Sequence, residues 1–481
     1  MLVDKTNETL NVKRSLILAG GGMRVAYQAG VLLALEESGI KFTHVDGTSG
    51  GIFNTAMLAS GLQPKEIAER WRTLKISHFV SGRKFKNYLN PFFMSGYADA
   101  DNIRGKVFPH LGIDLEAIHQ NESINATFNV CNFSDKTIKA FGNIEVQVDH
   151  LIAGVSLPIF MPALQIGDDW YTDAVWIKDA NLLEGIKQQS QELWVVWAIG
   201  NSRSYYPGAF NQYVHMIEMS ANGALLEEYN QISLINKAIA QGTGGYSQKE
   251  PIKLFLIKSL MPLPLDPELF FNKVNTRELI NMGYENAKSY LGKQPVLAEK
   301  MDKNATRSSD PGAVLSFRAT FDEKLKWDSV ESLIIFYTYM RLDVHNEDQN
   351  FSVFSSIYIA ALNQEIPAYG HQVRRIKHKD FTLLNISAKL LINQEEYLLR
   401  SVLKLHSPLE VIMGLGLKKI SLTIKKRTND LEVLVLQGNL YQSISNRLKA
   451  CYSTNVKTEK GKAGGIGKRY KLISKLMDNE I

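Results

Sequence analysis

Residues 14–39 read "RSLILAGGGMRVAYQAGVLLALEESG": an apolar run, three consecutive glycines and a stretch with helical spacing of its apolar residues. This order predicts a buried strand, a tight turn and then a helix. One glycine is usually enough for a tight turn. Three in a row, Gly20 to Gly22, suggest a backbone that approaches another group closely, or one that presents unhindered N–H groups.

The same alternation of strand and helix continues along the first part of the chain. We expect strands in "FTHVDG" (42–47), "ELWVVWAIG" (192–200) and "IKLFLIKS" (252–259), and a helix in "GIFNTAMLASG" (51–61). Strands that alternate with helices form a largely parallel sheet with helices on both faces. The predicted fold class is therefore α/β with three α/β/α layers.

The chain of 481 residues is too long for a single compact core, so we expect more than one domain. The α/β domain should cover residues 1–297, followed by a polar linker at 298–314. Residues 315–455 contain β-rich runs separated by short turns and predict a smaller, mainly antiparallel domain. Within it, "SVESLIIFYTYM" (329–340) fits a strand or a helix equally well. Residues 456–481 form a basic tail that could be attracted weakly to an anionic membrane.

The composition excludes several classes of protein. The hydrophobic content is 45%, the charged content 22% and the net charge only +6, which is typical of a soluble globular protein and argues against a nucleic-acid binder. We find no secretory signal and no apolar run of about 18 residues, so we expect a cytoplasmic protein whose membrane contact, if any, is peripheral. The two cysteines, Cys131 and Cys451, predict neither a disulfide framework nor a zinc site.

A serine motif follows the second predicted strand. Residues 47–51 read Gly-Thr-Ser-Gly-Gly and satisfy G-x-S-x-G between a strand and a helix, which is the position of a nucleophile elbow. Such a turn holds its serine in a strained conformation that projects the hydroxyl away from the sheet. Gly47 and Gly51, two residues on either side of Ser49, would then pass too close to their neighbours to carry a Cβ.

The first glycine run acquires a role beside this serine. A serine that attacks an ester creates an oxyanion, which preorganised donors must stabilise. The backbone N–H groups of Gly21, Gly22 and Met23, at the start of a helix, would supply these donors. Both turns follow parallel strands and should open at the same edge of the sheet. A dinucleotide-binding site is a poorer interpretation because "GGGMRV" lacks the final glycine.

The base that would activate Ser49 is less obvious. None of the ten histidines lies in a distinctive motif, although His215 fits the chain order of a Ser-Asp-His triad. "IGDDWYTDAVWIKDA" (166–180) offers Asp173, with Asp168, Asp169 and Asp179 as nearby rivals. An exposed aspartate with a pKa near ~3.9 is a poor base at neutral pH. Asp173 therefore requires burial and a short hydrogen bond to Ser49.

Together these segments resemble the patatin-like phospholipase family over about residues 14–290. That family combines a G-G-G-x-[RK]-G turn, a G-x-S-x-G elbow and a D-G-[GA] aspartate, for which this chain has "GGGMRV", "GTSGG" and "DAV". The "SLPIFMP" stretch (156–162) resembles the S-x-P-x-x-x-P segment of the family. The resemblance implies a lipid or phospholipid substrate, no cofactor or metal, Ser49 as nucleophile and Asp173 as base. It also implies an oxyanion hole formed by Gly20, Gly21, Gly22, Met23 and Arg24.

Two departures from the family pattern keep alternatives open. Val25 replaces a glycine, and Ala174-Val175 replace small residues beside the aspartate, where a glycine could permit a special backbone conformation. A catalytically inactive lipid-binding or scaffolding protein is one alternative, and a hydrolase that uses His215 is another. Acyl transfer to an alcohol is a third, because the acyl-enzyme would be common to hydrolysis and transfer.

Overall fold

The chain forms two compact units in this computed structural model. It describes residues 12–79, 81–82, 96, 98–243, 248–264, 269, 271–293, 298, 300–309, 313–345, 348–407, 417–428, 431–457, 467, 470–471 and 474. One unit comprises Met1–Asp266 and Tyr290–Ser308, and the other comprises Pro267–Ser289 and Ser309–Ile481. Most of the basic tail at 456–481 lies outside the described residues.

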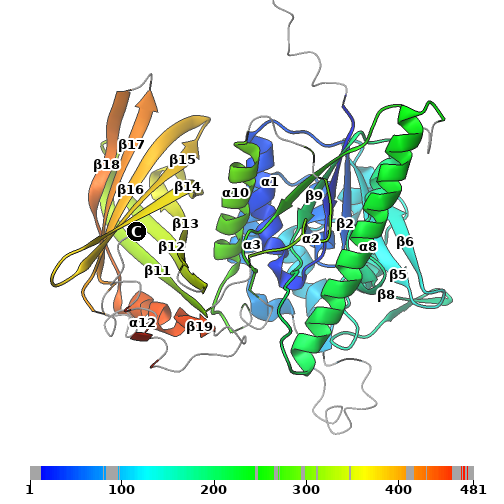
Figure 1. The fold of residues 1–481 in the computed structure, drawn as a ribbon, viewed down its shortest axis with the longest axis horizontal. Coiled ribbons are helices and arrows are strands. Elements are labelled where there is room, and N and C mark those ends of the chain that lie inside the picture. The colour runs from blue at the N-terminus through cyan, green and yellow to red at the C-terminus, as the bar shows by residue number, and fades with distance from the viewer. Residues whose placement is uncertain are drawn as a thin grey trace, which may run out of the picture. The chain divides into compact units, whose positions relative to one another are not determined.

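A mostly parallel sheet forms the centre of the first unit (Figure 1), with the strand order β10-β9-β1-β2-β5-β8-β7 and β6 paired with β5. The first five strands in this order run parallel, and β6, β7 and β8 add antiparallel pairs. This arrangement confirms the predicted α/β class. The strands are β1 (Arg14–Leu18), β2 (His44–Thr48), β5 (Asn125–Asn132), β6 (Thr137–Gly142), β7 (Leu164–Ile166), β8 (Asp169–Asp173), β9 (Glu192–Trp197) and β10 (Lys253–Lys258), with a separate pair β3 (Ser81–Gly82) and β4 (Ala98–Asp99).

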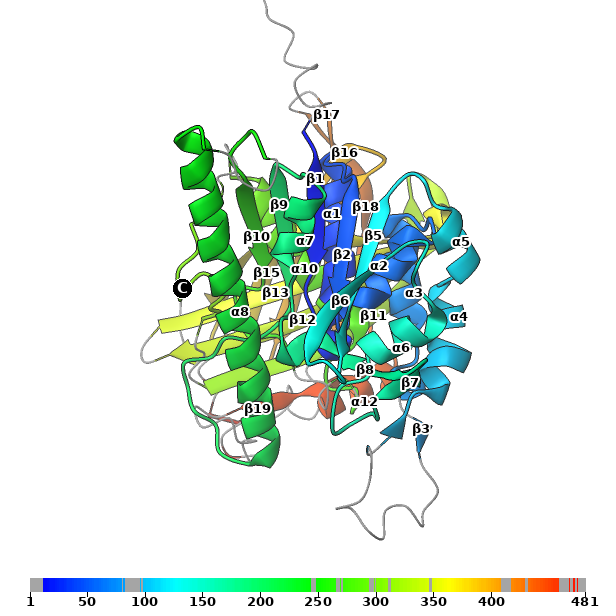
Figure 2. The same ribbon diagram turned by 90° about the vertical axis from the view of Figure 1, so that its right-hand side faces the viewer.

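Helices cover both faces of this sheet, which explains why its central strands are almost continuously buried. Figure 2 looks onto the face covered by α7 and α8, where leucine, isoleucine and valine side chains from both layers form one core. The helical segments are η2 (Gly22–Val25), α1 (Ala26–Glu37), α2 (Gly51–Ala59), α3 (Pro64–Thr73), η3 (Ile76–Phe79), η6 (Ile103–Val107), α4 (Phe108–Leu111), α5 (Leu115–Gln120), α6 (Val148–Gly154), η7 (Ala174–Trp176), α7 (Leu182–Lys187) and α8 (Ala209–Ala240).

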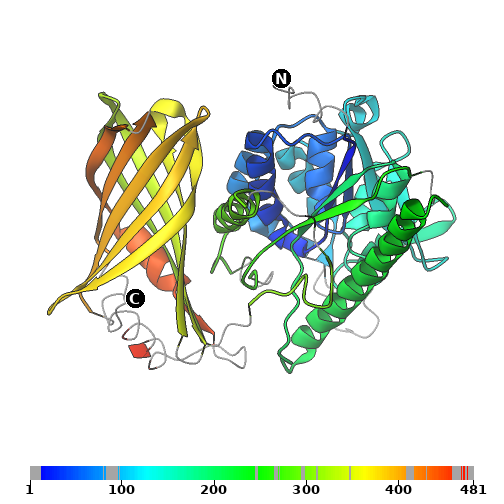
Figure 3. The same cartoon turned by 45° about the horizontal axis from the view of Figure 1, so that its top comes forward.

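An antiparallel sheet that closes on itself forms the second unit (Figure 3), because β11 pairs with both β12 and β18. The ambiguous run at 329–340 lies mainly in a strand of this sheet. The elements are β11 (Ala313–Trp327), β12 (Val330–His345), β13 (Asp348–Ile359), η8 (Ala360–Leu362), β14 (Gln364–Lys377), β15 (Thr382–Ile392), β16 (Glu395–Leu405), β17 (Lys419–Thr428), β18 (Leu431–Tyr441), α12 (Ile444–Ser453) and β19 (Asn455–Lys457), preceded by helix α10 (Thr276–Leu291).

Alternation of side chains explains this closed sheet. In β15 every second residue is buried, from Thr382 to Ile392, and the buried apolar residues of successive strands form one core. Two-residue turns with positive φ, Asp328-Ser329 and Asn393-Gln394, join neighbouring strands. Such turns match the right-handed twist of the strands, so they help to set the register of each hairpin.

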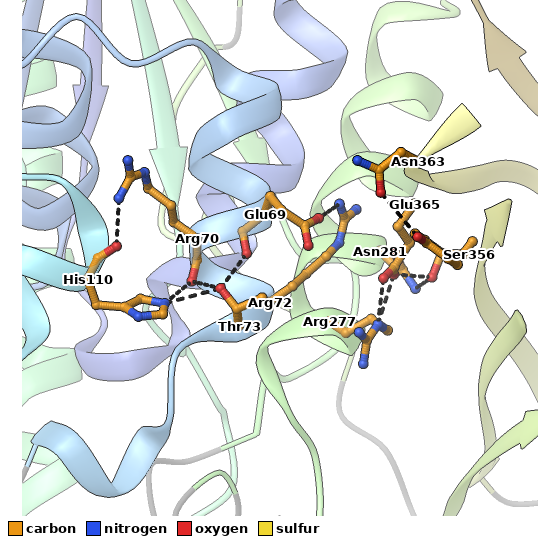
Figure 4. A network of polar contacts seen from close by, with 11 residues as sticks. Glu69, Arg70, Arg72, Thr73, His110, Arg277, Asn281, Ser356, Asn363 and Glu365 are labelled. Atoms are coloured by element: carbon orange, nitrogen blue, oxygen red, sulfur yellow. Dashed lines mark hydrogen bonds and ion pairs between the residues drawn. The ribbon is translucent and has the colours of Figure 1, made fainter. Parts of the chain in front are cut away.

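Helix α10 explains why the two units divide differently from the expected boundary at 297/298. Arg277 donates to both carboxylate oxygens of Glu365 on β14, at 2.9 and 3.0 Å, and Ser356 on β13 donates to Glu365 at 2.7 Å (Figure 4). Asn281 donates to Ser356 at 3.2 Å. These contacts connect the helix to the closed sheet, and Pro267–Ser289 accordingly belongs to the second unit.

The stretch expected to be a linker, 298–314, packs partly on the first unit. Met301 is only 6% exposed and belongs to the core between the sheet and α8. Thr306 accepts a hydrogen bond of 2.7 Å from Asn201, in the loop after β9. The many polar residues of this stretch favoured a linker, whereas the apolar side chain of Met301 attaches it to the core of the first unit.

We expect Phe336→Ala in β12 to lower the free energy of unfolding by about 3–5 kcal/mol, because Phe336 is fully buried in the core of the closed sheet. Urea denaturation followed by circular dichroism measures the effect. Leu333→Ala, at a 38% exposed position of the same strand, is the matched control and should cost far less. Equal losses in the two variants would contradict the inward orientation of Phe336.

Candidate active site

Ser49 lies in the sharp turn between β2 and α2, and its φ of 51° is in the left-handed region. The residues two positions before and after Ser49 are glycines because neither position has room for a Cβ. A Cβ on Gly47 would collide with the side chain of Thr55, and a Cβ on Gly51 would collide with the carbonyl oxygen of Leu18. The structure therefore gives both expected elbow glycines a steric reason and holds Ser49 in a strained backbone conformation.

The three-glycine turn fits directly against this elbow. Gly21 and Gly22 have φ values of 145° and 59°, which favour glycine. A Cβ on Gly20 would overlap the Cβ of Ser49, and a Cβ on Gly50 would overlap the carbonyl group of Gly22. The close approach suggested by the sequence is thus an approach of one turn to the other.

Two backbone N–H groups in this turn are available as donors. The N–H groups of Gly21 and Gly22 have no hydrogen-bond partner among the described residues. The N–H of Gly20 donates instead to the carbonyl of Asp179 at 3.1 Å, and that of Arg24 donates to the carbonyl of Gly21 at 3.2 Å. Of the expected oxyanion-hole residues, Gly20 and Arg24 shape the turn rather than offer a backbone donor.

Arg24 adds a second contact to the turn, since its side-chain Nε donates to the carbonyl of Gly21 at 2.9 Å. Met23 lies in the short helix η2 that follows the turn. Val25, where the family has glycine, is fully buried, and its carbonyl accepts a hydrogen bond of 2.9 Å from Asn54 on α2. The valine thus takes part in packing between the two turns without distorting them.

Asp173 ends strand β8 and meets Ser49 at the carboxyl edge of the parallel sheet. The Ser49 hydroxyl donates to Oδ2 of Asp173 at 2.6 Å, and the N–H of Val175 donates to Oδ1 at 2.9 Å. Both side chains are buried, with exposures of 5% for Ser49 and 1% for Asp173. The structure therefore brings together the two residues that the sequence analysis paired, in the short, buried hydrogen bond that their chemistry requires.

Burial makes Asp173 a stronger base than an ordinary aspartate. Loss of solvation raises the pKa of Asp173 to about 7, although the hydrogen bonds from Ser49 and Val175 oppose the rise. A carboxylate with a pKa near the ambient pH can accept a proton from serine and return it. No histidine is needed for this exchange.

The replacement of the family glycines by Ala174 and Val175 leaves the backbone unstrained, because neither residue has a positive φ. Val175 also contributes the N–H that holds the Asp173 carboxylate, and its side chain is buried, as is that of Ala174. This departure from the family pattern therefore preserves the local geometry of Asp173.

Three of the four rival residues, His215, Asp168 and Asp169, lie away from Ser49. His215 accepts a hydrogen bond of 3.0 Å from the Tyr206 N–H through Nε2, and its Nδ1 lies 3.5 Å from Glu218. Asp169 accepts a hydrogen bond of 2.9 Å from Asn132, on the neighbouring strand. Asp168 lies in the turn before β8. None of these three side chains forms a hydrogen bond with Ser49 in the described part of the chain.

A buried polar network lies along β2 below Ser49. His44 bonds to Thr127 at 2.9 Å, and Thr127 and Asn129 donate to Asp46 at 2.6 and 2.7 Å. Burial raises the pKa of Asp46 to about 7 and lowers that of His44 to about 4. These bonds join β2 to β5 through side chains as well as backbone, and so help to fix the strand that carries the serine.

A cluster of three aromatic side chains lies near Asp173. Tyr213 on α8 makes edge-to-face contacts with Trp176 and Phe160 at 5.6 and 5.3 Å between ring centroids, and its hydroxyl donates to the carbonyl of Pro158 at 2.7 Å. Burial and the negative charge of Asp173 raise the pKa of Tyr213. Tyr213 could not be predicted from local sequence, because helix α8 comes near Asp173 only through the tertiary fold.

Ser355, His371 and Glu285 form a line of side-chain contacts in the other unit. The Ser355 hydroxyl lies 2.7 Å from Nε2 of His371, and Nδ1 of His371 lies 2.8 Å from Glu285 on α10. Ser355 is fully buried in the middle of strand β13, unlike a serine raised on a sharp turn. We interpret this line of contacts as a structural link between α10 and the closed sheet.

Among the residues that the structure describes, no group of three or more histidine, cysteine, aspartate or glutamate side chains is placed to hold a metal ion. No helix in the described part of the chain is long and apolar enough to cross a membrane.

A known family model matches part of the first unit. Residues 16–184 match the family model described as patatin-like phospholipase. No curated protein matches the sequence. A solved structure, full-length SpcU in complex with full-length ExoU from the type III secretion system of Pseudomonas aeruginosa, contains a similar chain with 14% identity and a TM-score of 0.26; the match covers 58% of this chain. This chain spans about half, 52%, of the length of that chain.

We expect Asp173→Asn to stabilise the protein at pH 8 and to do so much less at pH 5. The pKa of Asp173 is about 7 in the folded chain, against an ordinary value of 3.8, so its negative charge destabilises the fold increasingly as the pH rises between these values. The gain at pH 8 should be on the order of 2–4 kcal/mol, measured by urea denaturation at both pH values. Asp169→Asn is the control on the same strand, and an equal effect of Asp173→Asn at both pH values would contradict the expectation.

Proposed function

Since residues 16–184 match the patatin-like phospholipase family, we propose that this protein is a serine hydrolase of lipid carboxylic esters. Members of that family are in general lipid acyl hydrolases. The observation that carries the proposal for this chain is the buried hydrogen bond of 2.6 Å from Ser49 to Asp173, beside the unpartnered N–H groups of Gly21 and Gly22.

The first half of the proposed reaction acylates the serine. Asp173 accepts the hydroxyl proton while Oγ of Ser49 bonds to the ester carbonyl carbon. The carbonyl oxygen becomes an oxyanion, to which the N–H groups of Gly21 and Gly22 donate. When the tetrahedral intermediate collapses, the carbon–oxygen bond to the alcohol breaks, and Asp173 returns its proton to the departing alkoxide.

The second half releases the fatty acid. Water attacks the acyl-enzyme and gives a proton to Asp173, and a second tetrahedral intermediate forms at the same oxyanion donors. Its collapse breaks the bond to Oγ of Ser49, which recovers the proton from Asp173. If an alcohol replaces water in this step, the same groups perform acyl transfer. The aromatic residues around Tyr213 would contact the acyl chain, and we expect the protein to meet its lipid at the membrane surface, peripherally.

We expect Ser49→Ala and Asp173→Asn each to abolish fatty-acid release, with losses of at least about a thousandfold. The measurement is release from mixed phospholipid vesicles and from short-chain esters. For the wild type, the rate should rise with pH through about 7, because Asp173 must be ionised to accept the proton.

Asp169→Asn, which alters a carboxyl group on the same strand outside the Ser49 contact, is the matched control and should retain activity. Vesicle binding without release by the wild type would favour a lipid-binding protein. Acylated alcohol as the main product, when an alcohol is supplied, would favour an acyltransferase.

A further inference from the structure

A second buried carboxyl group lies at the candidate active site and has no role in the reaction described above. Asp179 is 1% exposed, in the loop between η7 and α7. Neither of its carboxyl oxygens has a hydrogen-bond partner in the described structure, whereas Asp173 has a donor on each oxygen. Buried polar groups are seldom left without partners, so this carboxyl group indicates that a ligand atom is to be received there.

The position of Asp179 places it against the reacting serine. A Cβ on Gly20 would overlap both the Asp179 carboxyl group and the Cβ of Ser49. Because Gly20 has no side chain, the Asp179 carboxyl group and Ser49 can both lie beside its Cα. The main-chain carbonyl of Asp179 also accepts the N–H of Gly20 at 3.1 Å, which fixes the residue to the turn that carries the oxyanion donors.

The charges around Asp179 favour its neutral form. Burial and the negative charge of Asp173 raise the pKa of Asp179 well above its ordinary value, and the positive charge of Arg24 opposes this rise only in part. Arg24 is also shared with Glu218 on α8: burial raises the pKa of Glu218, and the positive charge of Arg24 opposes that rise.

The other charged groups nearby are already engaged with each other. Lys178, the residue before Asp179, pairs with Glu228 on α8, and Glu218 pairs with His215. None of these pairs supplies a full positive charge to the Asp179 carboxyl group. Of two neighbouring carboxyl groups with different environments, one then ionises and serves as base while the other retains its proton and can donate.

We propose that Asp179 is a further catalytic residue, whose protonated carboxyl group donates a hydrogen bond to the ester oxygen that becomes negative when Ser49 attacks. The inference rests on the proposed function of Ser49 and Asp173. Asp179 supplements the N–H groups of Gly21 and Gly22 as a third donor to the oxyanion. Its proton stays on the carboxyl group throughout, so the proton transfers of acylation and deacylation described above are unchanged.

The test compares wild type, Asp179→Asn and Asp179→Ala in the full chain, with a soluble p-nitrophenyl ester between pH 5 and 10. The wild-type profile should be bell-shaped, because the rate rises as Asp173 ionises and falls at higher pH, along the high-pH limb, as Asp179 loses its proton. The two apparent pKa values of this profile belong to the coupled pair of carboxyl groups. Asp179→Asn keeps a donor that cannot ionise. It should retain kcat within about tenfold of the wild type, and its rate should no longer fall at high pH.

Asp179→Ala should lower kcat by about a hundredfold or more with a smaller change in KM, as for removal of an oxyanion donor. Asp46→Asn is the matched control: it removes another fully buried aspartate of raised pKa and should leave the high-pH limb in place. Thermal unfolding identifies variants that fail to fold. If Asp179→Ala is one of these, the pH profile of Asp179→Asn decides.

Two results would overturn the role of Asp179 alone: an unchanged high-pH limb in Asp179→Asn, which marks a merely structural residue, or wild-type kcat in folded Asp179→Ala. A different result would overturn the proposed function, and the role of Asp179 with it. In that case the wild type neither hydrolyses the ester nor becomes labelled on Ser49 by a fluorophosphonate probe.

Discussion

The contact between two glycine turns is the constraint on which the first unit depends. The turn after β1 and the turn after β2 approach so closely that a single Cβ on Gly20, Gly50 or Gly51 would collide with the other turn or with the end of β1. This approach is possible because β1 and β2 are parallel neighbours, so their carboxyl ends lie at one edge. The serine and its two backbone donors are therefore positioned by the sheet itself and not by mobile loops.

Burial, rather than a histidine, sets the basicity of the candidate site. Taking a carboxyl group out of water costs free energy when it is charged, and that cost brings the pKa of Asp173 to about 7. Strain at Ser49 and the destabilising charge of Asp173 lie at the same place, which is common where reactivity is maintained at the expense of stability. The polar network of His44, Thr127 and Asp46 is satisfied and holds the strand below them.

Much of this arrangement could be predicted from local sequence. The order of apolar runs and glycines indicated the α/β sheet and both turns, and the family resemblance selected Asp173 among several aspartates. The proposed role of Asp179 could not be predicted from the sequence, because its contact with Gly20 joins residues far apart in the chain. Helix α10 was likewise assigned to the first domain, since its attachment depends on Glu365 and Ser356, which lie far downstream.

Closure of the sheet in the second unit has a consequence for how this part of the chain can vary. Because β11 pairs with β12 at one side and with β18 at the other, loss of one strand would break two ladders and expose the shared apolar core. Length changes should then be confined to the hairpin connections, while the number of strands is inherited as a whole. The described sheet of the first unit has borders at β10, β7 and β6, where elements can be added without opening its centre.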